Sequence, residues 1–208
     1  MARDRSESFA HLEGRLDDAE RRYAEAVDTM RRQASLHVGS MTLQSRASVL
    51  ATRGRLAELA PDTDQLSQAR HPMSVDILGA ALAAAGRHDG ARALLADSVP
   101  LSHPLLFPLF STFRAQAVIA LDDRETADAL YASLLAYRDS PPAGIANLAV
   151  VVPPAAHTLG ELAVLLGRHE RAAEHFTRAV AIAEHWHATR WAAQSRTALA
   201  AIRSAVIT

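Results

Sequence analysis

The chain has 208 residues, 49% of them hydrophobic, and a formal net charge of −1. This near-neutral charge leaves no overall basic field to attract nucleic acid or anionic lipid. The sequence contains neither cysteine nor lysine, which excludes disulfides, thiolate nucleophiles, sulfur-ligated metals, lysine Schiff bases and the lysine-dependent phosphate loop.

Abundant alanine and few aromatic residues favour packed helices over a sheet, so we expect an all-α protein. No stretch reaches the ~18 to 20 uninterrupted apolar residues of a membrane span, and residues 1–9 hold no apolar signal core. We therefore expect a cytoplasmic protein that contacts no membrane and no nucleic acid directly. Neither a metal nor a cofactor is expected, because the sequence has no dinucleotide or metal-binding motif.

The first long helix is predicted from residue 12 onward, where 12–27 places apolar and small residues at helical spacing behind a glycine. Two arginine pairs, at 21–22 and 31–32, belong to the same helix. Because Glu25 and Asp28 stand between the pairs, we interpret them as a solvated face and not as a site for an anionic partner.

Two later segments are copies of one unit. Residues 76–98 align without a gap against 157–179, and both contain the turn sequence Gly-Arg-His. On each side of the turn, apolar residues recur at the spacing of a helix. We expect Gly86 and Gly167 to end the first helix of each unit in a left-handed conformation.

Within each unit, a glycine precedes the turn at the position where two helices must cross closely. These glycines are Gly79 and Gly160. The histidines of the turns, His88 and His169, are expected to be half-buried rings that pack at the start of the second helix.

The segment 101–116 is apolar nearly all round, which predicts a buried helix. We expect Pro104 to start this helix and Pro108 to interrupt its first turn. If the protein holds an apolar ligand, the phenylalanines of this segment are candidates for the wall of its site. They are Phe107, Phe110 and Phe113.

Residues 121–137 match the repeat unit at Ala127 and Tyr131 but lack the turn glycine, so the array is irregular. The β-branched run at 147–154 ends in two prolines. We expect an extended entry into the next helix there, since proline is tolerated in a first helical turn.

The unit at 155–185 resembles the tetratricopeptide repeat, with small residues at the crossing positions and rings at the packing positions. The residues that carry the resemblance are Leu159, Gly160, Ala163, Gly167, His169, Ala172, Phe176 and Ala179. It implies one domain over 1–208, with its best units at 73–99 and 155–185. The implied fold is a right-handed α-solenoid of about five antiparallel helix pairs with a C-terminal capping helix.

A narrower resemblance covers 54–203. Its succession of units is similar to the C-terminal helical-repeat regions of large bacterial signal-transduction ATPases and of LuxR-type and antibiotic-regulatory activators. In those proteins the region looks like a domain that senses a ligand or a partner. The resemblance therefore implies a role in transcriptional or signalling regulation.

In a tetratricopeptide array the first helix of each pair lines the concave surface, where exposed polar residues one turn apart form a groove. The alignment selects Gln44, Ser48, Asp76, Thr112, Gln116, His157, Glu161 and, on the last helix, Arg190 with Gln194. Trp186 and Trp191 flank the last two as flat walls or, equally, as a packed cap. Polar residues that converge on a groove are the usual form of a ligand site.

His157 and Glu161 form the sharpest pair in this row. Their i, i+4 spacing puts them on one helix face, where a carboxylate can orient an imidazole for acid–base chemistry. An ordinary surface hydrogen bond is the simpler explanation of the pair, because two polar residues four apart on a helix are common. A shared metal ion is not expected, because His185 and His187 would point about 200° apart around a helix.

Our main prediction is a non-catalytic module that binds a protein partner or a small effector in the groove. The second is a freestanding enzyme of a specialised biosynthetic pathway, with His157 and Glu161 or Asp76 as acid and base. A third is a homodimerising scaffold, since helical arrays often bury an exposed face against a copy of themselves.

Overall fold

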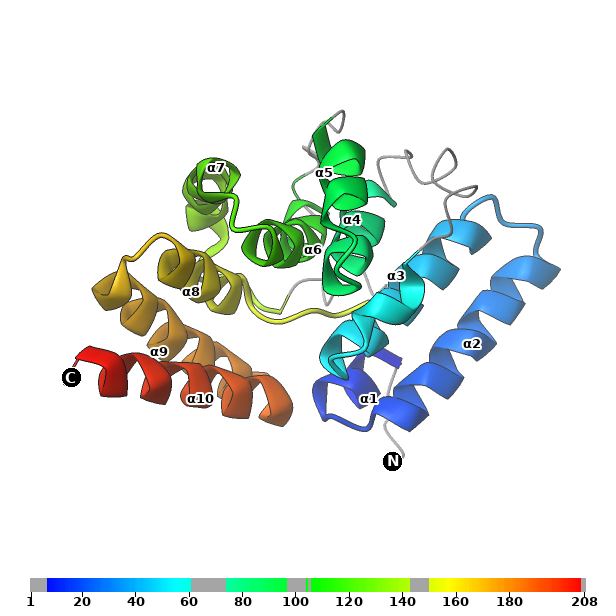
Figure 1. Cartoon of the computed structure of the whole chain (residues 1–208). Coiled ribbons are helices and arrows are strands. Elements are labelled where there is room, and N and C mark those ends of the chain that lie inside the picture. The colour runs from blue at the N-terminus through cyan, green and yellow to red at the C-terminus, as the bar shows by residue number, and fades with distance from the viewer. Residues whose placement is uncertain (1–6, 61–73, 97–103, 105, 143–149, 207–208) are drawn as a thin grey trace.

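The chain forms an array of helices, shown in the computed structural model of Figure 1, which describes residues 7–60, 74–96, 104, 106–142 and 150–206. Within these ranges the regular structure consists of ten α-helices and two 3-10 helices, and no strand occurs. The all-α prediction is confirmed. The helices are α1 (Glu7–Leu12), α2 (Leu16–Arg32), α3 (Val38–Thr52), η1 (Leu56–Leu59), α4 (Val75–Ala84), α5 (His88–Ala96), α6 (Phe107–Ala120), α7 (Arg124–Leu134), η4 (Leu135–Tyr137), α8 (Ala155–Leu165), α9 (His169–His185) and α10 (Thr189–Val206).

Helices that follow each other in the chain pack side by side. The pairs α4 with α5, α6 with α7, and α8 with α9 are each in contact, and α10 packs along α9. The first helices of these three pairs also touch in succession, α4 against α6 and α6 against α8. Among the described residues, no helix is both long enough and apolar enough to cross a lipid bilayer.

The helices end in a recurring backbone motif. At Gly86, with φ of +74°, the amide of Arg87 donates to the Leu82 carbonyl at 2.9 Å and the Gly86 amide donates to the Ala83 carbonyl at 3.0 Å. This Schellman pattern satisfies carbonyls at a helix end that have no partner within the helix. It is repeated at Gly14, Gly54 and Gly167 and, with non-glycine residues at positive φ, at Ala34, Asp122 and His187. The prediction for Gly86 and Gly167 is confirmed.

The close helix crossings are also confirmed. A Cβ atom on Gly160 would lie 2.7 Å from Cε1 of Phe176 on α9, and one on Gly79 would lie 2.9 Å from Cδ2 of Leu95 on α5. The expectation for His88 and His169 is wrong, because both side chains are exposed. Each begins its helix and faces solvent, while the alanine three residues later faces the core.

The helix α6 begins later than expected. Pro104 lies in a turn, and Pro108 lies in the first turn of α6, where its missing N–H breaks no helical hydrogen bond. Pro108 therefore helps to start the helix, and the prediction that it interrupts the first turn is wrong. The expected burial is confirmed for Leu109, Phe110 and Phe113.

Between Pro142 and α8, the described residues 150–154 are extended and lead into α8 at Pro154, as predicted; 147–149 lie outside the described residues. The side chains of the valines alternate, as on a β-strand. Val150 and Val152 pack with the α3, α4 and α6 side chains, whereas Val151 packs with α1, α9 and α10. The segment thus lies inside the array, between its two halves.

The helix α1 also reaches across the array. Leu12 packs with Trp191 and with Ala183, Ala188 and Ala192 at the junction of α9 and α10. The His11 ring lies 5.7 Å from the Trp191 ring, measured between centroids. Together with residues 150–152, α1 occupies part of the space that we expected to be an open groove.

Candidate functional site

The inner surface retains a small hollow, which we call the central hollow. Its volume is about 40 Å³. Its lining residues come from α3, α6, α8, α10 and the extended segment: Ser48, Ala51, Thr52, Thr112, Phe113, Gln116, Val152, Pro153, His157, Glu161, Trp191 and Gln194. Six polar residues selected from the sequence therefore line one hollow: Ser48, Thr112, Gln116, His157, Glu161 and Gln194.

Helix periodicity explains how these residues meet. On each of α3, α6 and α8, two polar side chains stand four residues apart and therefore share a face. Because α6 packs against α8, these polar faces come together. The predicted exposure is nevertheless wrong for Ser48, Thr112 and His157, which are buried. Ser48 is covered by Val151 and His11, whereas Thr112 lies against Thr158 of α8. His157 lies against Ser195 of α10 and Phe176 of α9.

The hydroxyl groups of the central hollow donate their protons to backbone carbonyls. Ser48 Oγ donates to the Val151 carbonyl. Thr52 Oγ1 donates to the Ser48 carbonyl at 2.8 Å, and Thr112 Oγ1 donates to the Pro108 carbonyl at 3.0 Å. Because a hydroxyl has one proton and two lone pairs, these oxygens can act further only as acceptors. Two of them already face other polar groups, Thr52 Oγ1 the Nε2 atom of His11 at 2.9 Å and Thr112 Oγ1 the hydroxyl of Thr158 at 3.4 Å.

His157 connects α8 to α10. Its Nδ1 lies 2.9 Å from Ser195 Oγ, and its Nε2 lies 3.5 Å from Glu161 Oε1. A neutral imidazole with its proton on Nε2 satisfies both contacts, since Nδ1 then accepts from the serine hydroxyl. The Phe176 ring meets the imidazole edge-on, with centroids 5.3 Å apart. His157 is thus held rigidly from three sides.

Ser195 was not selected from the sequence, although the pattern of α10 contained a signal. It stands on the same helical stripe as the buried residues Trp191, Leu199 and Ile202. A polar residue in an apolar stripe indicates a buried partner. In the structure that partner is His157, and the side chain of Ser195 is 0% exposed.

Asp76 lies away from the central hollow. Its Oδ1 accepts a hydrogen bond from Arg114 Nε at 2.6 Å, and both side chains are buried between α4 and α6. Burial raises the pKa of Asp76, and the charge of Arg114 and its hydrogen bond oppose that shift in part. Asp76 thus joins two helices and is not placed with His157.

Two other residues of the predicted row also lie outside the hollow lining. Gln44 is buried one turn before Ser48 on α3. Arg190 is exposed, and its Cβ lies 3.8 Å from where a Cβ on Gly14 would stand. Arg190 therefore lies beside the turn between α1 and α2.

The predicted apolar wall is divided among several places. Phe113 and Trp191 line the central hollow. Phe107 stacks at a tilt on Tyr137 with ring centroids 5.4 Å apart, and Phe110 belongs to the core. Trp186 packs against α8 and α9 residues, including Ile182. The hollow consequently has one aromatic ring on each of α6 and α10.

His11 lies directly behind the hollow and was not selected from the sequence. Its Nε2 is 2.9 Å from Thr52 Oγ1, and its Nδ1 is 3.3 Å from Ser48 Oγ and 3.4 Å from Tyr23 Oη. Burial lowers the pKa of His11 to about 4, and the charges of Arg190 and Arg53 add to this effect. His11 therefore connects α1 to the hydroxyl groups of α3 as a neutral ring.

A larger hollow of about 310 Å³ lies between α2 and α3, and we call it the α2–α3 hollow. Tyr23, Val27 and Val49 form apolar parts of its lining. Arg46, also in the lining, makes no ion pair with any described residue. The sequence offered no signal for this hollow, because it depends on how far α2 and α3 diverge.

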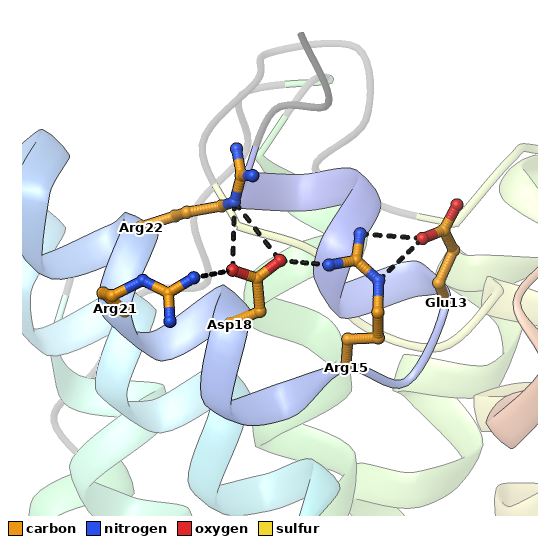
Figure 2. A network of polar contacts seen from close by, with 5 residues as sticks. All are labelled: Glu13, Arg15, Asp18, Arg21 and Arg22. Atoms are coloured by element: carbon orange, nitrogen blue, oxygen red, sulfur yellow. Dashed lines mark hydrogen bonds and ion pairs between the residues drawn. The ribbon is translucent and has the colours of Figure 1, made fainter. Parts of the chain in front are cut away.

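The arginine pair at 21–22 belongs to an ion-pair network at the start of α2 (Figure 2). Asp18 accepts from Arg15, Arg21 and Arg22, and Arg15 also contacts Glu13 at 2.8 Å. Partial burial alone would raise the pKa of Asp18, but its hydrogen bonds and ion pairs with Arg22 and Arg15 lower it overall. The arginines are thus neutralised by the carboxylates of Asp18 and Glu13, and the pair at 21–22 belongs to a solvated face, as predicted.

Comparison with protein-family models, curated proteins and solved structures gave no match. The chemistry of the site must therefore be inferred from its own side chains. Among the described residues, no group of three or more histidines and carboxylates is arranged to hold a metal ion. The central hollow offers hydroxyl groups, two side-chain amides, an indole, one imidazole and one carboxylate, and Ser195, which contacts the imidazole, is fully buried.

Proposed function

We propose that the chain is a non-catalytic binding module that holds a group of a partner or effector in the central hollow. In this proposal the helix pairs form a tetratricopeptide-like, right-handed solenoid with α10 as its cap. We further propose that this module acts in transcriptional or signalling regulation. The observation that carries it is the convergence of polar side chains from four helices on one hollow.

The size of the hollow determines how a partner would engage it. A volume of about 40 Å³ is far below the ~300 Å³ or more of a pocket that encloses a whole small-molecule ligand. One small polar group fits, and a whole peptide does not. The remainder of the partner would lie on the surrounding surface, where Glu161 is partly exposed and Gln194 is exposed.

A second candidate is an enzyme, because Ser195, His157 and Glu161 stand in the order of a nucleophile, a base and an orienting carboxylate. The complete burial of Ser195 opposes this candidate, since a substrate would reach the hydroxyl only after α10 moved. Asp76 is a weaker base candidate than Glu161, because its carboxylate is already paired with Arg114.

The proposal is tested by NMR with the ¹⁵N-labelled full chain and a panel of small cationic, anionic and neutral fragments. We expect at least one fragment to shift the amide signals of Thr112, Gln116 and Glu161 together, and Gln116→Leu to weaken its binding. If no fragment perturbs these signals, the hollow does not bind and the proposal is wrong. Turnover of an activated ester that disappears in Ser195→Ala would instead favour the enzyme.

A further inference from the structure

The α2–α3 hollow is a second candidate site, separate from the central hollow. We propose that it binds a small carboxylic acid with an apolar body, such as a medium-chain fatty acid. Three features carry this inference: a volume suited to a small molecule, an apolar floor, and an arginine at the rim that has no counter-ion among the described residues. The inference does not depend on the function proposed for the central hollow.

The volume of the α2–α3 hollow is about 310 Å³. Pockets that hold small ligands begin at roughly 300 Å³, so this hollow lies at the small end of that range. It is formed within one helical hairpin, because α3 follows α2 after a short connection and packs beside it (Figure 1). A small molecule is therefore the occupant that the size of the hollow favours.

The floor of the hollow is apolar. Tyr23, Val27 and Val49 line it, and all three are buried. Ser45 is buried beside them, and its hydroxyl donates at 3.1 Å to a backbone carbonyl of its own helix. The Tyr23 hydroxyl lies 3.4 Å from His11 Nδ1 on α1, so the tyrosine presents mainly its ring to the hollow. An alkyl chain or an aromatic ring placed on this floor would leave water without displacing a hydrogen bond.

The rim of the hollow carries the charges. Glu20 contacts Arg53 at 3.0 Å, and Asp28 is paired with Arg31, which also lines the hollow. Arg46 is exposed, and its guanidinium group makes no ion pair with any described residue. A guanidinium group matches a carboxylate with two parallel hydrogen bonds. A ligand whose apolar body fills the floor can therefore place its carboxylate against Arg46.

The same arrangement disfavours other head groups. A cation would have to compete with Arg53 for Glu20 or with Arg31 for Asp28. A neutral head group would leave Arg46 without a charged partner. Among ligands with one and the same alkyl chain, the carboxylate should bind more tightly than the alcohol, and the alcohol at least as tightly as the ammonium.

The experiment is a titration of the ¹⁵N-labelled full chain with octanoate, followed by NMR at pH 7.5 and below the concentration at which octanoate forms micelles. We expect saturable shifts of the Val27, Ser45 and Val49 amides, weaker binding of octanol, and no tighter binding of octylammonium than of octanol. Arg46→Gln should lower the octanoate affinity about threefold to tenfold, because a partly exposed charge-assisted contact is lost. The same variant should leave the octanol affinity unchanged, whereas a general disturbance of the fold would lower both.

Control variants separate the site from general effects. Arg203→Gln removes an exposed arginine of α10 that makes no ion pair with any described residue, and it should not change octanoate binding. Ala24→Leu adds bulk at an exposed position of the hollow lining without removing a core contact, and leucine suits a helix. It should weaken octanoate and octanol together, whereas Ala132→Leu, at an exposed alanine of α7, should change neither affinity.

Several results would overturn the inference. Octanoate that binds no more tightly than octanol, or an Arg46→Gln variant that weakens both equally, would show that Arg46 holds no carboxylate. Shifts confined to Thr112 and Gln116 would place the acid in the central hollow, and the absence of saturable shifts would show that the α2–α3 hollow binds no such acid. A dimer in analytical ultracentrifugation that Ala24→Leu dissociates would show that a second copy covers the hollow.

Discussion

Acidification should destabilise the folded chain through His11. The ring is 2% exposed and lies between α1, α3 and α10, where it faces Tyr23, Ser48, Thr52 and Trp191 and the charges of Arg190 and Arg53. Its pKa is about 4 in the folded chain, lowered mainly by burial, against 6.5 for an unperturbed histidine. The unfolded chain therefore binds the proton more tightly than the folded chain.

The sign and the magnitude follow from this difference. Protonation of His11 does not affect the free energy of unfolding well above pH 6.5, and it lowers that free energy progressively as the pH falls from 6.5 toward 4. The full difference between the two pKa values corresponds to about 3 kcal/mol, of which about 2.5 kcal/mol is already lost at pH 4.5. This loss is a large fraction of the stability of a domain of this size.

The measurement is urea unfolding followed by circular dichroism at pH 7.5, 6.0, 5.0 and 4.5. We expect His11→Gln to be less stable than the native chain at pH 7.5 and the gap between them to close by about 2.5 kcal/mol at pH 4.5. His37→Gln, at an exposed histidine, should follow the native chain throughout. A gap that stays constant from pH 7.5 to 4.5 would refute the reasoning, because His11 would then not titrate with unfolding.

Three substitutions test the backbone and the helix crossings by the midpoint of urea unfolding. Gly160→Ala should lower the free energy of unfolding by about 1 to 3 kcal/mol, because the new Cβ would lie 2.7 Å from Phe176. Adding Phe176→Leu should recover part of that loss, and strictly additive effects of the two substitutions would disprove the clash. Gly167→Ala should lower the free energy of unfolding by about 1 kcal/mol, because Gly167 has a φ of +74°. Gly39→Ala, at a position on α3 with open space around it, should be neutral or stabilising, and equal effects of the two substitutions would show that the positive φ does not matter. Ala34→Gly should stabilise by about 0.5 to 1 kcal/mol, because Ala34 adopts φ of +52°, and a loss of stability would show that its methyl group matters more.

Local rules predicted much of the fold. The Gly-Arg-His turns indicated where helices end, because a left-handed residue favours glycine. The gap-free alignment located the crossings at Gly79 and Gly160, and the i, i+4 spacing brought His157 and Glu161 to one hollow. The turns and the i, i+4 pair depend on residues within one or two helical turns of one another, where periodicity fixes the geometry, and the alignment applies the same local rule to a second unit.

What lay beyond local rules could not be predicted. The sequence of 150–152 indicates an extended segment, but it does not indicate that the segment packs with α3, α4 and α6 on one side and with α1, α9 and α10 on the other. His11 occupies a helix of six residues, so its burial depends on contacts with Thr52 and Trp191 that are distant in sequence. Asp76 matched the polar row by position, but a buried Arg114 on another helix determines its role.

The contact of α1 with the α9–α10 junction affects how the molecule unfolds. In an array whose units touch only their neighbours, melting can begin at either end and move inward. Here Leu12 is packed with Val151 and Trp191, so the first helix, the central segment and the last helix share one cluster. No end of the described array can separate without disturbing the middle, and the array should therefore lose its structure in a single cooperative transition.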